Sequence, residues 1–119
     1  MMPYEDINQI LARVYSDYRG NNKEKLVLIT DDDDYTVIES GDKYSVAIPL
    51  GSVIRALAKK GKHMGQVVSI VHNHNRDEDV SAGDVKGYGA FKNIGFKGGY
   101  YVYHPRTGRL LTVPAPKEK

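Results

Sequence analysis

The most informative segment of the chain reads VVSIVHNHNRDEDVSAGDV and covers residues 67–85. Its start belongs to the apolar run QVVSIV (66–71), which predicts a strand buried on both faces. His72 and His74 follow directly. If the strand continues through them, both imidazoles point to the same side, because side chains alternate along a strand. Two such histidines are candidate ligands of one metal ion, although His-x-His also occurs by chance.

Ser81 and Asp84 form a second pattern, Ser-x-x-Asp, at the start of a helix expected over about 82–94. A serine followed three residues later by an acidic residue is typical of a helix N-terminal capping box. The acidic side chain also favours the positive end of the helix dipole. A cap fixes where the Asp84 carboxylate points, so this interpretation is compatible with a third metal ligand.

Hydrophobic periodicity predicts the other elements. The order is α-β-β-β-α-β-α-β-β, which predicts an α/β (α+β) domain with a mixed sheet packed against two to three helices. The predicted elements are a helix within 1–20, strands at 24–30, 35–40 and 44–49 with turns at 31–34 and 41–42, a helix from Pro49 to Gly61 or Gly65, a strand at 66–71, a helix at 82–94 and a hairpin of 100–104 and 110–113.

Composition limits the classes of protein and of site. The 119 residues suit one domain, residues 1–119, ending in a frayed tail at 115–119. The net charge of +2 does not indicate a nucleic-acid partner. Without cysteine, a metal ion must be held by His, Asp, Glu or water. The N-terminus does not resemble a signal peptide and no apolar run is long enough for a membrane span, so we expect a cytoplasmic protein.

Glu24 makes the two patterns more specific. It opens the strand KLVLIT and lies 72 − 24 = 48 residues before His72. A glutamate at an early strand, a helix, a buried strand ending in His-x-His and then Ser-x-x-Asp resembles the JAMM (JAB/MPN) metalloprotease family. The RadC-like branch is the most similar, and the resemblance covers residues 22–115. The C-terminal YYVYHPRTGRLLTV is also similar to JAB-like modules of bacterial polymorphic toxins.

The resemblance implies a JAB/MPN-like fold whose catalytic core is residues 22–115, with one zinc ion. Its ligands would be His72, His74 and Asp84, with water in the fourth position. Glu24 would act as general base on that water, and Ser81 would donate to the developing oxyanion. The expected substrate is a peptide or protein cleaved at a peptide or isopeptide bond, and ubiquitin-like proteins are among the candidates.

Two departures from the family motif leave alternatives open. Asn75 stands where the family usually has proline, and the six residues NRDEDV between His74 and Ser81 are one fewer than usual. Asp77, Glu78 or Asp79 is therefore an alternative ligand. The same departures favour a second hypothesis, a catalytically inactive scaffold or partner-binding module of the same fold.

A third hypothesis is a DNA-nicking endonuclease of the His-x-His type. Tyr88 would be its nucleophile, with Lys92 four residues later. The polar Asn73 between the histidines and the short separation of 88 − 74 = 14 residues disfavour this hypothesis. His104, before Pro105, is interpreted as a structural residue.

Overall fold

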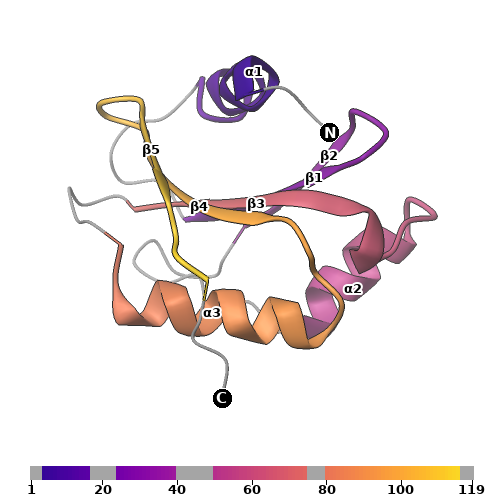
Figure 1. Ribbon diagram of the computed structural model, residues 1–119. Helices are drawn as coiled ribbons and strands as arrows, with labels where there is room; N and C mark the ends of the chain where they lie inside the picture. The colour runs from indigo at the N-terminus through magenta and orange to yellow at the C-terminus, as the bar shows by residue number, and fades with distance from the viewer. Residues whose placement is uncertain (1–3, 17–23, 40–49, 75–79, 116–119) are drawn as a thin grey trace.

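The computed structural model describes residues 4–16, 24–39, 50–74 and 80–115. These segments form three α-helices, five β-strands and one 3₁₀ turn, in the order shown in Figure 1. The elements are α1 (Tyr4–Val14), β1 (Lys25–Thr30), β2 (Tyr35–Glu39), α2 (Leu50–Ala58), the 3₁₀ turn (Met64–Gln66), β3 (Val67–Asn73), α3 (Ala82–Asn93), β4 (Gly99–His104) and β5 (Arg109–Thr112).

The described strands form one mixed sheet in the order β2-β1-β3-β4-β5. β1 runs antiparallel to both of its neighbours, β3 and β4 are parallel, and β5 returns antiparallel to β4. The parallel pair requires a crossover, which α3 provides. β3, which contains His72 and ends one residue before His74, is the central strand.

Helices cover both faces of this sheet. Figure 1 shows α1 on one face and α2 and α3 on the other. Side chains of β1 and β3 alternate between two hydrophobic clusters because successive residues point to opposite faces. Val27, Ile29 and Val71 pack with α1, whereas Leu26, Leu28 and Ile70 pack in the cluster that contains Val53 and Leu57 of α2 and Phe91 of α3.

The predicted class, a mixed sheet packed against helices, is confirmed. The turn at 31–34 is present, and β3 extends two residues past its predicted end, through His72 and Asn73. The predicted strand at 44–49, the turn at 41–42 and most of the tail lie outside the described residues. Within the described part of the chain, no helix has the length and apolar character needed to cross a membrane.

One glycine of α3, Gly87, lies close to the sheet. Gly87 and Gly89 lower the helix propensity of this segment, yet α3 is continuous from Ala82 to Asn93. A Cβ atom at Gly87 would lie 3.4 Å from the Tyr100 hydroxyl oxygen of β4. Gly87 therefore lies close to the sheet, three residues after Asp84, where a Cβ atom would just reach van der Waals contact with Tyr100.

Candidate metal centre

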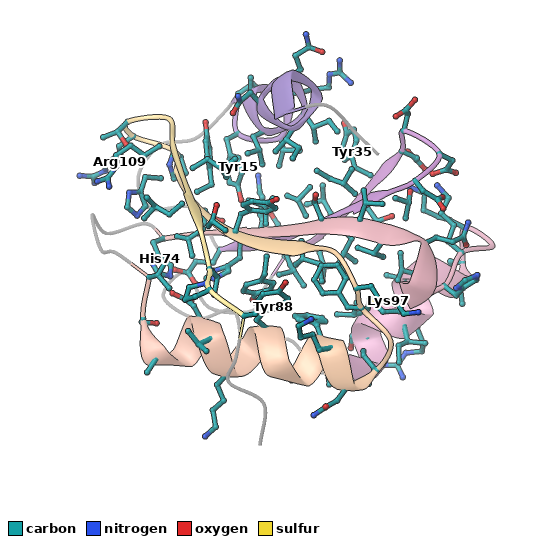
Figure 2. All side chains as sticks on the ribbon, viewed as in Figure 1. Tyr15, Tyr35, His74, Tyr88, Lys97 and Arg109 are labelled. Atoms are coloured by element: carbon teal, nitrogen blue, oxygen red, sulfur yellow. The ribbon has the colours of Figure 1, made fainter. Side chains whose placement is uncertain are left out.

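β3 brings the two predicted histidines to one face of the sheet. His72 is its penultimate residue and is 1% exposed. His74 follows the strand, and its backbone N–H donates to the Tyr103 carbonyl of β4 at 3.0 Å. Their rings are 5.0 Å apart between centroids. Figure 2 shows His74 between the sheet and the start of α3, where the side chain is partly open to solvent.

The N-terminal cap of α3 positions Asp84. Ser81 is the N-cap, and its hydroxyl oxygen accepts from the Asp84 backbone N–H at 3.3 Å. Asp84 returns the contact through Oδ2, which accepts from the Ser81 N–H at 2.7 Å and from its hydroxyl at 3.1 Å. Because the cap engages Oδ2, the other carboxylate oxygen, Oδ1, faces β3. The capping interpretation of Ser-x-x-Asp is thus correct, and the cap also orients the carboxylate.

The three predicted ligands converge. Asp84 Oδ1 lies 2.9 Å from His72 Nε2 and 3.3 Å from His74 Nε2. One nitrogen or oxygen atom from each residue lies within 4.8 Å of the other two, an arrangement that could hold a metal ion. Tetrahedral zinc with bonds of about 2.0–2.1 Å places neighbouring ligand atoms about 3.3 Å apart. The two measured separations are close to that spacing.

His72 provides the clearest test of whether these residues fit a metal ion. Both of its ring nitrogens are buried, and neither makes a hydrogen bond to any residue that the structure describes. Asp84 Oδ1 lies 2.9 Å from Nε2, which is within hydrogen-bond length, but Nε2 does not make a hydrogen bond to it. Buried polar atoms normally have partners, and a cation bound by Nε2 and Oδ1 together would supply one. Two imidazoles and a carboxylate are also a common zinc donor set, so the residues fit zinc.

One feature differs from the usual zinc site. A histidine that binds metal commonly donates its second N–H to a carboxylate or carbonyl group. His72 Nδ1 makes no such hydrogen bond within the described residues. Instead, its ring packs against Tyr100, with centroids 5.5 Å apart, so packing orients this imidazole.

The electrostatics keep the Asp84 carboxylate ionised. Burial by itself raises the pKa of this carboxyl group, but the neighbouring imidazoles of His72 and His74 and the Ser81 N–H lower it. The net result is a pKa far below the usual value for aspartate. Burial and, secondarily, the Asp84 charge raise the pKa of Tyr100, so its phenol stays neutral. Asp84 therefore presents a negatively charged oxygen between the two histidines.

Glu24 lies beside this cluster. It immediately precedes β1, in which Leu26 pairs with His72 across the antiparallel ladder. The ladder ends at this pair. Extended by two residues, to the residue two before Leu26 and the residue two after His72, the same register would bring Glu24 opposite His74 on the same face of the sheet. Glu24 is buried, and its carboxylate is not one of the three groups that converge. This position suits a residue beside the metal site rather than a ligand.

Ser81, the N-cap of α3, is exposed. Its hydroxyl hydrogen is directed to Asp84 Oδ2. Donation to an oxyanion would therefore require this hydroxyl to rotate away from Asp84 Oδ2. The Ser81 backbone N–H would keep its own hydrogen bond to Asp84 Oδ2. The alternative ligands Asp77, Glu78 and Asp79, like Asn75, lie outside the described residues.

His104, interpreted from the sequence as structural, lies next to the cluster. Val102 pairs with His72 in the parallel ladder of β3 and β4, so His104 comes beside His74. The two rings are stacked with centroids 6.1 Å apart, and His104 is buried. The alternation of YYVYH places it on a definite face of β4. Only the pairing of β3 with β4, which the sequence does not reveal, brings it to His74.

The residues of the nicking hypothesis lie elsewhere on α3. The Tyr88 hydroxyl donates to the Gly98 carbonyl at 2.8 Å, and the ring is stacked on Tyr100. The Lys92 ammonium lies over the Tyr88 ring, 5.2 Å from its centroid. Figure 2 shows Tyr88 in the space between α3 and the sheet. A nucleophilic role would require this hydroxyl to leave its carbonyl partner, which disfavours the hypothesis.

Comparison of the chain with protein-family models, curated proteins and solved structures gave no match. The interpretation of the site therefore depends on the geometry of His72, His74 and Asp84. That geometry defines a candidate metal centre at the end of a central strand.

Proposed function

We propose that the chain is a zinc-dependent hydrolase of peptide or isopeptide bonds. The main support is the position of Asp84 Oδ1, within 2.9 and 3.3 Å of the Nε2 atoms of His72 and His74. The buried His72 ring, whose nitrogens have no hydrogen-bond partner among the described residues, adds to it. Zinc held by three protein ligands supplies a Lewis acid with an open coordination position, as catalytic zinc sites do.

The protein residues determine how a substrate reaches this site. His72 is the buried member of the cluster, whereas His74 is partly exposed and Ser81 is exposed. Among the described residues, the solvent-accessible side of the cluster is therefore the side of His74 and Ser81. An extended peptide passing this side would bring its carbonyl group toward the convergence point of the three ligands.

Glu24 is the proposed general base. Its register position opposite His74 allows its carboxylate to take a proton from the attacking water and return it to the leaving amine. Ser81 is the proposed donor to the carbonyl oxygen as negative charge develops there. These roles divide the site into ligands on β3 and α3, a base at the start of β1 and a donor at the helix cap.

Isothermal titration with zinc tests the metal site first. The wild type should bind one equivalent of zinc, and His72→Ala should remove that binding. His63→Ala is the matched control, because His63 is an exposed histidine remote from the cluster in sequence. Absence of binding by the wild type, or equal binding by His72→Ala, would contradict the proposal.

Hydrolysis is tested next with a fluorogenic peptide library and lysine-linked isopeptide substrates. Glu24→Gln should abolish turnover of any cleaved substrate while leaving zinc affinity within about threefold, because Glu24 is not a ligand. The control is Glu39→Gln, an exposed glutamate on β2 that pairs with Lys25 across the β1–β2 ladder. Unchanged turnover in Glu24→Gln would place the base elsewhere.

The second candidate function is a zinc-stabilised module that binds a partner without catalysis. The Ser81 hydroxyl favours it, since its hydrogen is already donated to Asp84 Oδ2 and is not directed into the opening. Stoichiometric zinc binding with no turnover of any substrate in the library would support this function over the hydrolase.

A further inference from the structure

Asn73, the residue between the two histidines, points to the opposite face of the sheet. It is fully buried, and its side-chain oxygen Oδ1 accepts two hydrogen bonds, each of 2.8 Å. One comes from the Tyr15 hydroxyl at the end of α1, and the other comes from the Lys25 backbone N–H. A buried amide is costly unless it is hydrogen-bonded. Asn73 therefore makes a specific connection on this face.

The Lys25 N–H belongs to the peptide bond that follows Glu24. The main-chain pairing of β1 with β3 ends at Leu26 and His72. The hydrogen bond from Lys25 to Asn73 Oδ1 continues the attachment of β1 to β3 by one residue beyond that pair. It thus holds the peptide bond after Glu24 against β3, one residue before the position that an extension of the register gives opposite His74.

Helix α1 is attached at the same place. Tyr15, directly after α1, donates to Asn73, and its ring lies 5.2 Å from that of Tyr103 on β4. The Lys25 ammonium donates to the Val14 carbonyl at 3.3 Å and lies 5.4 Å from the centroid of the Tyr15 ring. The end of α1 consequently contacts both residues that hold the Glu24 backbone, Asn73 and Lys25.

We propose that Asn73 is a positioning residue that fixes Glu24 beside His74, and that Tyr15 holds the Asn73 amide in the required orientation. This inference rests on the proposed function, in which Glu24 is the base. Asn73 itself faces away from the metal centre and touches neither metal nor substrate. Loss of its contacts should therefore displace Glu24 while the three ligands stay in place. Displacement of a catalytic group by about 1 Å can cost on the order of 10²-fold in rate.

The test compares Asn73→Ala, Asn73→Asp and Tyr15→Phe with wild type and Glu24→Gln. Alanine removes the acceptor, aspartate keeps an oxygen that both donors can reach, and phenylalanine removes only the donor on α1. Thr30→Val is the matched control, because Thr30 is a buried polar residue at the other end of β1 that bonds to Asp32.

Three measurements separate positioning from general destabilisation. Asn73→Ala should lower kcat at least tenfold with KM and zinc affinity within about threefold, whereas Asn73→Asp should recover most of kcat. Hydrogen exchange at the Lys25 amide should become at least tenfold faster in Asn73→Ala but not in Asn73→Asp. The ¹³C resonance of the Glu24 carboxyl should shift on zinc binding in the wild type and not in Asn73→Ala. Tyr15→Phe should lie between wild type and Asn73→Ala, and Thr30→Val should match wild type in all three.

The outcomes distinguish this inference from the proposed function. If the wild type turns over substrate and Asn73→Ala keeps its kcat, the positioning role is wrong and the hydrolase proposal stands. If the wild type has no turnover but the zinc-dependent Glu24 resonance shift is lost in Asn73→Ala, the positioning role stands and the hydrolase proposal fails. A Glu24 resonance that shifts equally in both proteins overturns the positioning role regardless of activity.

Discussion

Replacement of His72 by leucine should stabilise the protein in the absence of metal. The ring nitrogens of His72 are buried and make no hydrogen bond to the described residues. A buried polar group without a partner costs about 1–3 kcal/mol. Nε2 lies 2.9 Å from Asp84 Oδ1, whereas Nδ1 has no hydrogen-bond partner among the described residues, so we count the cost of Nδ1 alone. Leucine is of similar size, and imperfect packing after such a substitution costs up to about 1.5 kcal/mol. The net gain should be about 1 kcal/mol.

Calorimetric unfolding in chelator measures the stability of the metal-free protein, and the same experiment with zinc measures the stability that metal binding adds. One kcal/mol corresponds to about 4 °C in Tm for a chain of this length, so His72→Leu should melt about 4 °C above wild type in chelator. Zinc at about one hundred times its Kd should stabilise the wild type by about 2.7 kcal/mol, or roughly 11 °C, and leave His72→Leu unchanged. The order of the two melting temperatures should therefore reverse when zinc replaces chelator.

His72→Ala is the control for packing. It removes the same nitrogens but leaves a cavity at a fully buried position, and truncations of large core side chains typically cost about 2–5 kcal/mol. It should therefore melt below both proteins in chelator. Together the two variants separate the effect of the nitrogens from the effect of filling the space.

The result that would refute this reasoning follows from the rival account of His72. If the imidazole were a protonated partner of Asp84 in a buried ion pair, leucine would leave the carboxylate without its counter-charge. Breaking such a pair costs about 3–5 kcal/mol, so Tm would fall by roughly 12–20 °C in chelator. A fall of that size would identify the contact of 2.9 Å as structural and remove the main support for a metal centre.

Two further predictions concern parts of the fold outside the metal site. Hydrogen bonds from Lys62 and Lys60 lower the pKa of Asp34, so its contribution to stability is present above the unfolded pKa of about 3.9 and is lost as pH falls toward the folded value. Because Asp34 is 43% exposed, Asp34→Asn should cost only about 0.5–1 kcal/mol in urea unfolding at pH 5–7 and less below about pH 4; a difference independent of pH would contradict this. Gly87→Ala should raise Tm by about 2–4 °C, because alanine favours helix by about 0.5–1 kcal/mol and its Cβ would only touch the Tyr100 hydroxyl; a lower Tm would mean that Tyr100 cannot adjust.

Local rules predicted where His72, His74 and Asp84 lie on their own elements, whereas the resemblance stated from the sequence predicted that the three come together. Alternation along a strand places His72 and His74 on one face, and it needed no knowledge of the neighbouring strands. The capping box fixes Asp84 in the first turn of α3, on the same side of that helix as the buried Tyr88 and Phe91. Both signals act over a few residues, which is why a single sequence carries them.

Long-range pairing was not predictable in the same way. His104 reaches His74 only because β3 and β4 are parallel neighbours, and Asn73 reaches Tyr15 only because α1 packs on that face. The two residues of the latter pair are 58 positions apart in the chain. No periodicity specifies which helix covers which face, so the polar Asn73 could be noted in the sequence but not explained.

The tripeptide His72-Asn73-His74 connects the two faces of the sheet, and this arrangement has a consequence for mutations. The outer two residues face α3, where Asp84 and the packing of Tyr100 also constrain them. The middle residue faces α1, where Tyr15 and Lys25 depend on it. Changes at α1 should therefore act first on Glu24 and leave the ligands in place, whereas changes at the α3 cap should act first on Asp84. Zinc affinity and turnover should consequently respond to different sets of substitutions, even though both sets converge on three consecutive residues at the end of β3.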